Sequence, residues 1–151
     1  MRIWVDADAC PKVIKDILFN AAIRTHTELV LVSNSALTSP PSPFITKIQV
    51  LTGLDSADDK IIQQLQAGDL VITADIPLAD AVITNGGIAL NPRGELYSAA
   101  NIKQRLSIRN FSADLRGSGV RTGGPALLGK KEIQAFANSL DRVLMRHQKS
   151  K

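Results

Sequence analysis

The chain has 151 residues, of which 44% are hydrophobic and 21% are charged, and its formal net charge is +4. This composition is typical of one globular domain with a sizeable core, and it excludes a disordered or fibrous chain. The single cysteine, Cys10, excludes an intramolecular disulfide, and no apolar run approaches the roughly 20 residues that span a bilayer, so we expect a soluble, cytoplasmic protein without a membrane partner.

Residues 1–94 show a pattern of alternating strands and helices. Apolar runs predict strands at residues 2–6, 28–33, 44–52, 70–74 and 88–90. Helix-start signals stand at Pro11, Ser56 and Pro77. The first of these helices carries an apolar stripe of Val13, Ile14, Ile17, Leu18, Ala21 and Ala22, and the second is expected to stop at Gly68. Residues 34–43, rich in Pro and Ser, are expected to form a surface loop, and residues 91–94 a turn.

After residue 94 the pattern indicates helices only. Ser98 is expected to cap a helix that continues through Leu106 and Phe111, and a glycine-rich loop is expected over residues 117–129. The last helix has apolar residues at regular helical spacing, namely Ile133, Phe136, Ala137, Leu140, Val143 and Leu144. We therefore predict a single α/β domain over residues 1–151, with three layers, a mostly parallel sheet and a helical, basic C-terminal part over residues 95–151.

Acidic and basic residues are segregated along the chain. Residues 1–100 contain seven Lys or Arg and eleven Asp or Glu, a net charge of −4, whereas residues 101–151 contain eleven and three, a net charge of +8. A basic segment beside an acidic pocket suits a ligand with a phosphate backbone, because the cations hold the polymer and the acids hold a metal ion. Solvation of exposed helix faces is an equally good explanation for so small a total charge.

Asp6, Asp8, Asp55 and Asp75 each stand where an apolar run gives way to a helix start. The carboxyl ends of parallel strands converge, so we expect these acids to share one pocket. At about 5 Å and an effective dielectric near 20, each pair of carboxylates repels by about 3 kcal/mol, so protonation or a bound cation must compensate. Mg²⁺ and Mn²⁺ prefer such oxygen ligands, which indicates metal-assisted phosphoryl chemistry.

These acids also have structural explanations. The dipole of the helix after Pro11 favours one nearby acid, but Asp6 and Asp8 are two. The block 55–59 contains three acids where one cap is needed. Asp75 has an alternative explanation as the N-cap before Pro77. Capping therefore accounts for some of these carboxylates and leaves the others for chemistry.

Three further motifs carry less weight. Cys10 stands before a helix, but the residues after it offer neither an arginine nor a phosphate-binding backbone nest, and we do not predict a catalytic thiol. Residues 124–131 are a near miss to an ATPase P-loop, because Lys131 replaces the Ser or Thr and no strand precedes it. Arg116 and Arg121, among glycines, suit phosphate binding or belong to an ordinary connection.

Five motifs occur in order over nearly the whole chain: WVDADACP, GLDSADDKI, GDLVITADIPLA, LNPRG and TGGP. Together they resemble the bacterial YaiI/YqxD family, which is grouped with PIN-like domains. Most PIN-like domains are metal-dependent ribonucleases with an acidic pocket at the ends of a parallel sheet. The resemblance implies a PIN-like fold in which Asp6, Asp58 and Asp75 bind Mg²⁺ or Mn²⁺, and it matches Thr73 and Asp75 to the strand-end Thr-x-Asp of those nucleases.

The leading hypothesis is a divalent-metal-dependent nuclease that cleaves RNA or another phosphodiester with metal-activated water. The catalytic candidates are Asp6, Asp8, Asp55, Asp58 and Asp75, and the substrate-binding candidates are Thr73, Asn34, Arg93, Arg116 and Arg121. A non-catalytic module that binds RNA or a protein partner and holds a structural cation is the alternative. A small-molecule phosphatase is the third hypothesis.

Overall fold

The computed structural model describes residues 1–8, 10–34, 39–50, 57–104 and 129–149. Its strands are β1 (Arg2–Asp6), β2 (Glu28–Ser33), β3 (Ile45–Gln49), β4 (Leu70–Ile72) and β5 (Ile88–Leu90). Its helices are α1 (Lys12–Thr25), α2 (Ala57–Gln64), α3 (Ile76–Thr84) and α5 (Lys130–Lys149), and residues 99–104 are also helical. No helix in these described ranges is long and apolar enough to cross a membrane.

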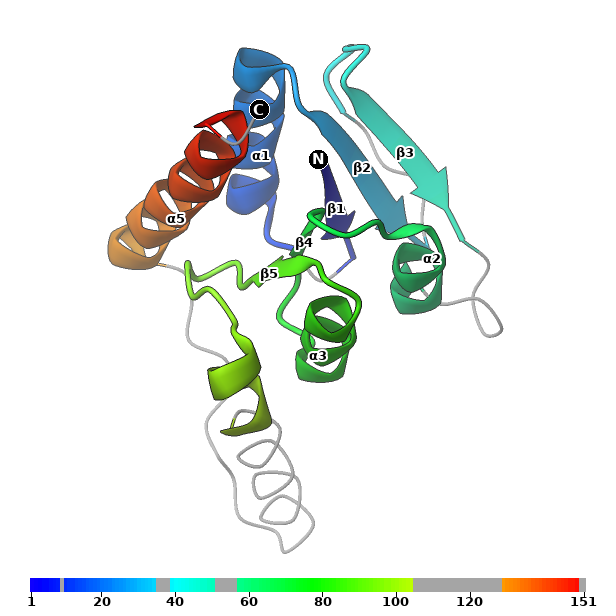
Figure 1. Ribbon diagram of the computed structural model, residues 1–151. Helices are drawn as coiled ribbons and strands as arrows, with labels where there is room; N and C mark the ends of the chain where they lie inside the picture. The colour runs from blue at the N-terminus through cyan, green and yellow to red at the C-terminus, as the bar shows by residue number, and fades with distance from the viewer. Residues whose placement is uncertain (9, 35–38, 51–56, 105–128, 150–151) are drawn as a thin grey trace, which may run out of the picture.

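The described strands form one sheet in the order β3-β2-β1-β4-β5, and each pair of neighbours among them is parallel. Helices cover both faces of this sheet (Figure 1). The α/β class and the three layers are therefore confirmed. The central strand β1 is buried on both faces, which explains why Ile3, Trp4 and Val5 form a continuous apolar run instead of an alternating one.

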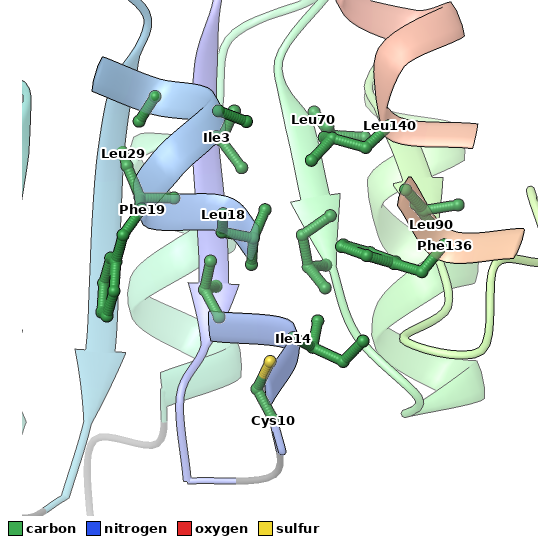
Figure 2. Packing of buried hydrophobic residues seen from close by; sticks show 14 of the residues in the cluster. Ile3, Cys10, Ile14, Leu18, Phe19, Leu29, Leu70, Leu90, Phe136 and Leu140 are labelled. Carbon is green, nitrogen blue, oxygen red and sulfur yellow. The ribbon is translucent and has the colours of Figure 1, made fainter. Parts of the chain in front are cut away.

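Each face of the sheet has its own core. On one face α1 and α5 pack over the sheet, and Phe136 of α5 lies beside Leu90 (Figure 2). On the other face α2 and α3 cover Trp4 and Val71. The apolar stripe predicted for the last helix thus faces the sheet, where Phe136, Leu140, Val143 and Leu144 are buried.

The turn after β5 is fixed to α5 at Gly94. This glycine has φ +96, a left-handed conformation that favours glycine. A Cβ atom there would stand 2.6 Å from the carbonyl carbon of Ala135, so a larger residue would overlap the backbone of α5. The Ser139 hydroxyl donates to the Gly94 carbonyl at 2.7 Å. Glycine at this position lets the helix approach the carboxyl end of the sheet.

Three predicted boundaries need correction, and so does the predicted apolar stripe of α1. The strand expected over 44–52 spans only Ile45–Gln49, and the one expected over 70–74 ends at Ile72, because the next residues build the cap of α3. Val13 is 38% exposed and does not belong to the buried stripe of α1, whereas Phe19 is buried. The helix expected to run to Gly68 ends at Gln64. The expected cap at Ser56, the helix continuation through Leu106 and Phe111, and the glycine-rich residues 117–128 lie outside the described residues.

Candidate functional site

The strand order of the sheet reverses at β1. From this strand, β2 and β3 extend the sheet to one side, and β4 and β5 extend it to the other. Asp6, the last residue of β1, pairs with Val32 of β2, and the preceding Val5 pairs with Ile72, the last residue of β4. Asp6 and Thr73 therefore leave neighbouring strands at the same edge. In open parallel sheets, ligands bind outside the carboxyl ends of the strands at such a reversal.

Asp75 caps helix α3. Its Oδ1 atom accepts a hydrogen bond from the Leu78 amide at 3.1 Å, and Pro77 lies in the first turn. The capping explanation given for this residue is therefore confirmed. The bond uses one carboxylate oxygen of a partly exposed side chain, so the cap leaves room for a cation at the other oxygen.

Thr73 stabilises this cap through the backbone of Asp75. Its hydroxyl oxygen accepts from the Asp75 amide at 2.9 Å, and its side chain is 2% exposed. Its own amide donates to the Leu90 carbonyl at 3.0 Å, which ties it to β5. Burial of this kind favours a role in orienting Asp75 over the substrate contact predicted for Thr73 from the sequence.

Asp8 connects the segments that follow β1 and β2. Its Oδ2 atom accepts from the Asn34 backbone amide at 2.7 Å. The Asn34 carbonyl in turn accepts from the Gln49 side chain at 3.4 Å. Asp8 and Asn34 are both exposed at the carboxyl edge, whereas Asp6 is half-buried. The structure thus brings two of the predicted residues together, through the main chain of Asn34.

The first turn of α1 contains Lys12 and Lys15 and no acid. The helix dipole favours acids at this end, so lysines here break a local rule, as residues at functional sites do. Burial raises the pKa of the Cys10 thiol to about 12, with Lys15 lowering it and Asp6 raising it. Lys15 and Asp6 therefore both lie close enough to the Cys10 thiol to act on its ionisation. Lys15 was not among the predicted site residues, although the basic first turn of this helix was a signal for it.

Cys10 itself is buried at the end of the core near Ile14 (Figure 2). A thiol with a pKa of about 12 carries its proton at neutral pH, and the thiol form is a poor nucleophile. This agrees with the expectation that Cys10 is not catalytic.

Arg93 lies in the turn that follows β5, at the same edge. Its amide donates to the side-chain oxygen of Asn91 at 2.7 Å, and the Asn91 side chain donates to the Tyr97 hydroxyl, also at 2.7 Å. The neighbouring Gly94 is held by α5. The turn is therefore held by the Asn91 side chain and by α5. It carries the cationic Arg93 at the edge of the sheet where the neighbouring strand β4 also ends.

The remaining candidates are not covered by the described residues. Asp55, Arg116 and Arg121 lie outside them, and of Asp58 only the backbone, in α2, is described. Within the described part of the chain, no group of three or more His, Cys, Asp or Glu side chains is arranged to hold a metal ion. Asp6 and Asp75 remain as candidate ligands there. Two carboxylates fit Mg²⁺, which keeps several waters and is often bound by one or two carboxylates.

A further aspartate, which the sequence did not single out, lies at the opposite end of the sheet. Asp69 is 4% exposed and accepts three hydrogen bonds, from the Trp4 indole and from the amides of Arg2 and Gln66, each at 3.0 Å. This set of donors satisfies the buried indole N–H and joins β1 to the turn before β4. Asp69 is a structural acid.

Comparison with known proteins gives matches over nearly the whole chain. The UPF0178 proteins of Syntrophotalea carbinolica and of Legionella pneumophila (strain Corby) are each 60% identical, over 147 and 146 residues, which cover 97% of this chain and 99% of the relative. The UPF0178 protein of Shewanella woodyi is 58% identical over 149 residues, 99% of each chain. No solved structure matches. Residues 4–146 match the family described as "Uncharacterized BCR, YaiI/YqxD family", and the chain therefore belongs to this family.

Proposed function

We propose that this chain is a divalent-metal-dependent nuclease that cleaves RNA or another phosphodiester. The observation behind the proposal is that Asp6 ends β1 and Asp75 follows β4, two adjacent parallel strands at the reversal of strand order. Mg²⁺ or Mn²⁺ bound at this edge would polarise a phosphate oxygen and lower the pKa of a bound water. Asp58 is the third carboxylate that the family resemblance implies.

The residues around these acids support a phosphodiester substrate. Lys15 lies in the first turn of α1, the helix that follows β1, and Arg93 follows β5 on the far side of β4. Acids between flanking cations suit a phosphate chain, because the cations contact its charged oxygens while the acids hold the metal ion. Thr73 holds the Asp75 amide, which fixes the direction in which that carboxylate leaves the helix.

One observation favours the alternative of a non-catalytic module. Asp75 caps α3 and Asp8 accepts from the Asn34 amide, so both acids have structural contacts in the absence of any reaction. A module of this kind would hold a structural cation and bind RNA without cutting it. Metal-dependent stability and RNA cleavage, measured on the same variants, distinguish the two functions.

The first experiment measures the stability gained from the metal ion. Asn caps a helix as well as Asp, so Asp75→Asn removes the charge and keeps the cap. At a Mn²⁺ concentration about 100 times its Kd, the wild type should gain about 2.7 kcal/mol in the free energy of unfolding, whereas Asp75→Asn and Asp6→Asn should gain much less. Thermal melts with and without Mn²⁺ measure the difference.

The matched control is Glu28→Gln, which removes one negative charge at the amino end of β2. On addition of Mn²⁺, this variant should gain as much free energy of unfolding as the wild type. If the wild type gains nothing, or if the two aspartate variants gain as much as this control, the metal site is wrong.

The second experiment measures cleavage of short RNA in Mn²⁺ or Mg²⁺. We expect a chelator to abolish cleavage, and we expect Asp58→Asn and Asp75→Asn to lower its rate by about 100-fold or more. Glu28→Gln, purified in parallel, should retain the wild-type rate and reports on contaminating nucleases. Equal rates in all variants would exclude the catalytic assignment. Salt-sensitive RNA binding without cleavage would favour the non-catalytic module.

Arg116 and Arg121 remain predicted substrate contacts. If they bind phosphates, changing both to Ala should reduce the salt dependence of RNA binding by about 0.7 in slope for each phosphate that is no longer neutralised, with metal affinity unchanged. Binding measured at several salt concentrations tests this. An unchanged slope would show that these arginines serve only the connection between helices.

A further inference from the structure

The described part of the chain has a pocket at the opposite end of the sheet from the candidate metal site. Four of its lining residues lie just before a strand or at its first position, namely Met1, Gly68, Gly87 and Ile88. Its volume is about 440 Å³, within the range of about 300–1,000 Å³ found for small-molecule sites. We call it the amino-end pocket.

The walls of the amino-end pocket are mostly apolar. Ile83 comes from α3, Leu96 from the segment that pairs with β5, and Val143 from α5. Leu96 is 40% exposed, so part of the wall faces solvent. Such a lining suits the hydrocarbon or aromatic body of a small molecule.

The exposed polar residues that line the pocket, Arg146 and Ser98, are cationic and neutral. Arg146 is exposed and lies three residues after Val143, on the same side of α5. The Ser98 oxygen accepts from the Asn101 amide at 3.1 Å, so its own hydroxyl proton is the part that can donate to a ligand. None of the described residues that line the pocket is acidic. This lining favours a ligand with an anionic group.

The backbone amides of Gly68 and Gly87 do not bind the anionic group of a ligand. The Gly68 amide donates to the Gly86 carbonyl at 3.0 Å, and the Gly87 amide donates to the Val82 carbonyl at 2.9 Å. Glycine at position 87 allows close packing against α3, because a Cβ atom there would stand 2.8 Å from a Val82 methyl group. Arg146 and Ser98 would therefore contact the anionic group of a ligand.

We propose that the amino-end pocket binds a small anion with an apolar body, a molecule in which a carboxylate or phosphate group is attached to a hydrocarbon or aromatic group. The apolar body lies against Ile83, Leu96 and Val143, and the anionic group lies at Arg146. This site is independent of the proposed nuclease site, because the two lie at opposite ends of the sheet and share no residue.

The experiment is an NMR titration of the full chain with three ligands of equal chain length: octanoate, octyl phosphate and octanol. The two anions should shift the amide signals of Gly68, Gly87 and Ser98, and leave those of Asp6 and Thr73 unchanged. They should bind about fivefold more tightly than octanol, the effect expected for an exposed ion pair. The first two ligands distinguish a carboxylate from a phosphate preference.

A matched pair of variants tests the role of the charge. Arg146→Gln and Arg142→Gln remove the same charge from the same helix, and Arg142 is exposed and outside the pocket. The preference for the anions should disappear in Arg146→Gln and remain in Arg142→Gln. Equal behaviour of the two variants, or shifts confined to the carboxyl end of the sheet, would overturn the proposal.

A third variant tests the apolar walls. Leu96→Trp should fill the pocket and abolish the binding of all three ligands, and because Leu96 is partly exposed we expect the fold to survive, which a thermal melt checks. Unchanged binding in this variant would place the ligand elsewhere. Asp75→Asn should leave ligand binding unchanged, so failure of the nuclease proposal and failure of this one are distinguishable.

Discussion

The two ends of the sheet both carry aspartates, in contrasting surroundings. At the amino end, Asp69 is 4% exposed and receives three N–H donors. At the carboxyl end, Asp75 is partly exposed and its cap bond uses one oxygen. A buried carboxylate is tolerated only with such a full set of partners, whereas a partly exposed one keeps oxygen atoms accessible to ligands. Burial and donors, more than residue type, separate a structural acid from a candidate chemical one.

The largest expected effect comes from truncating each acid in turn. Asp69→Ala leaves the buried Trp4 indole and two amides without their acceptor, so it should lower the free energy of unfolding by about 3 kcal/mol or more. Asp75→Ala removes only a helix cap, which costs about 1 kcal/mol. Urea unfolding measures both. Equal losses would mean that the contrast between the two ends of the sheet is wrong.

Two glycines sharpen the same comparison. Gly94 at the carboxyl end and Gly68 at the amino end both have positive φ, but only Gly94 is packed against α5, because nothing lies within 4 Å of a Cβ atom at Gly68. Gly68→Ala should therefore cost about 1 kcal/mol for backbone strain alone. Gly94→Ala should cost about 3 kcal/mol, because overlap with the helix is added. The change in unfolded-chain entropy is common to both variants. If the two variants lose the same free energy of unfolding, α5 moves away from residue 94 without cost.

The smallest expected effect concerns the pH dependence of stability. The folded state holds the Cys10 proton up to a pKa of about 12, against 9.0 for an unperturbed thiol. The stabilisation is therefore complete below pH 9 and is lost as the pH rises toward 12. Between pH 8 and pH 10 the wild type should lose about 1.4 kcal/mol more than Cys10→Ala. Parallel pH profiles of the two proteins measure this, and identical profiles would show that the thiol ionises freely.

Local sequence signals predicted many of the elements well. The bounds of β2 and β5 were predicted correctly, because each is a run of apolar residues that ends at a turn signal. The C-terminal helix stripe was likewise clear at a spacing of three and four residues. The placement of Asp6 and Asp75 at the same edge of the sheet followed from a rule of parallel sheets, which holds without knowledge of strand order. These predictions needed only local pattern and one general rule of topology.

Features that join distant segments could not be predicted in the same way. Trp4 and Asp69 are 65 residues apart, and nothing near either residue indicates the other. The amino-end pocket is assembled from several separate segments of the chain. The end of β4 was misplaced for a related reason, because Thr73 and Asp75 support a cap and not a longer strand.

The position of α5 has a consequence for synthesis of the protein. Phe136 and Leu140 belong to the same core as Ile3, and Arg24 of α1 pairs with Asp141, 117 residues later. The part of this face that α1 does not cover therefore stays exposed until α5 has left the ribosome. A chain interrupted before residue 130 would expose an apolar surface of the kind that chaperones and proteases recognise, so α5 must be synthesised before the domain is protected from them.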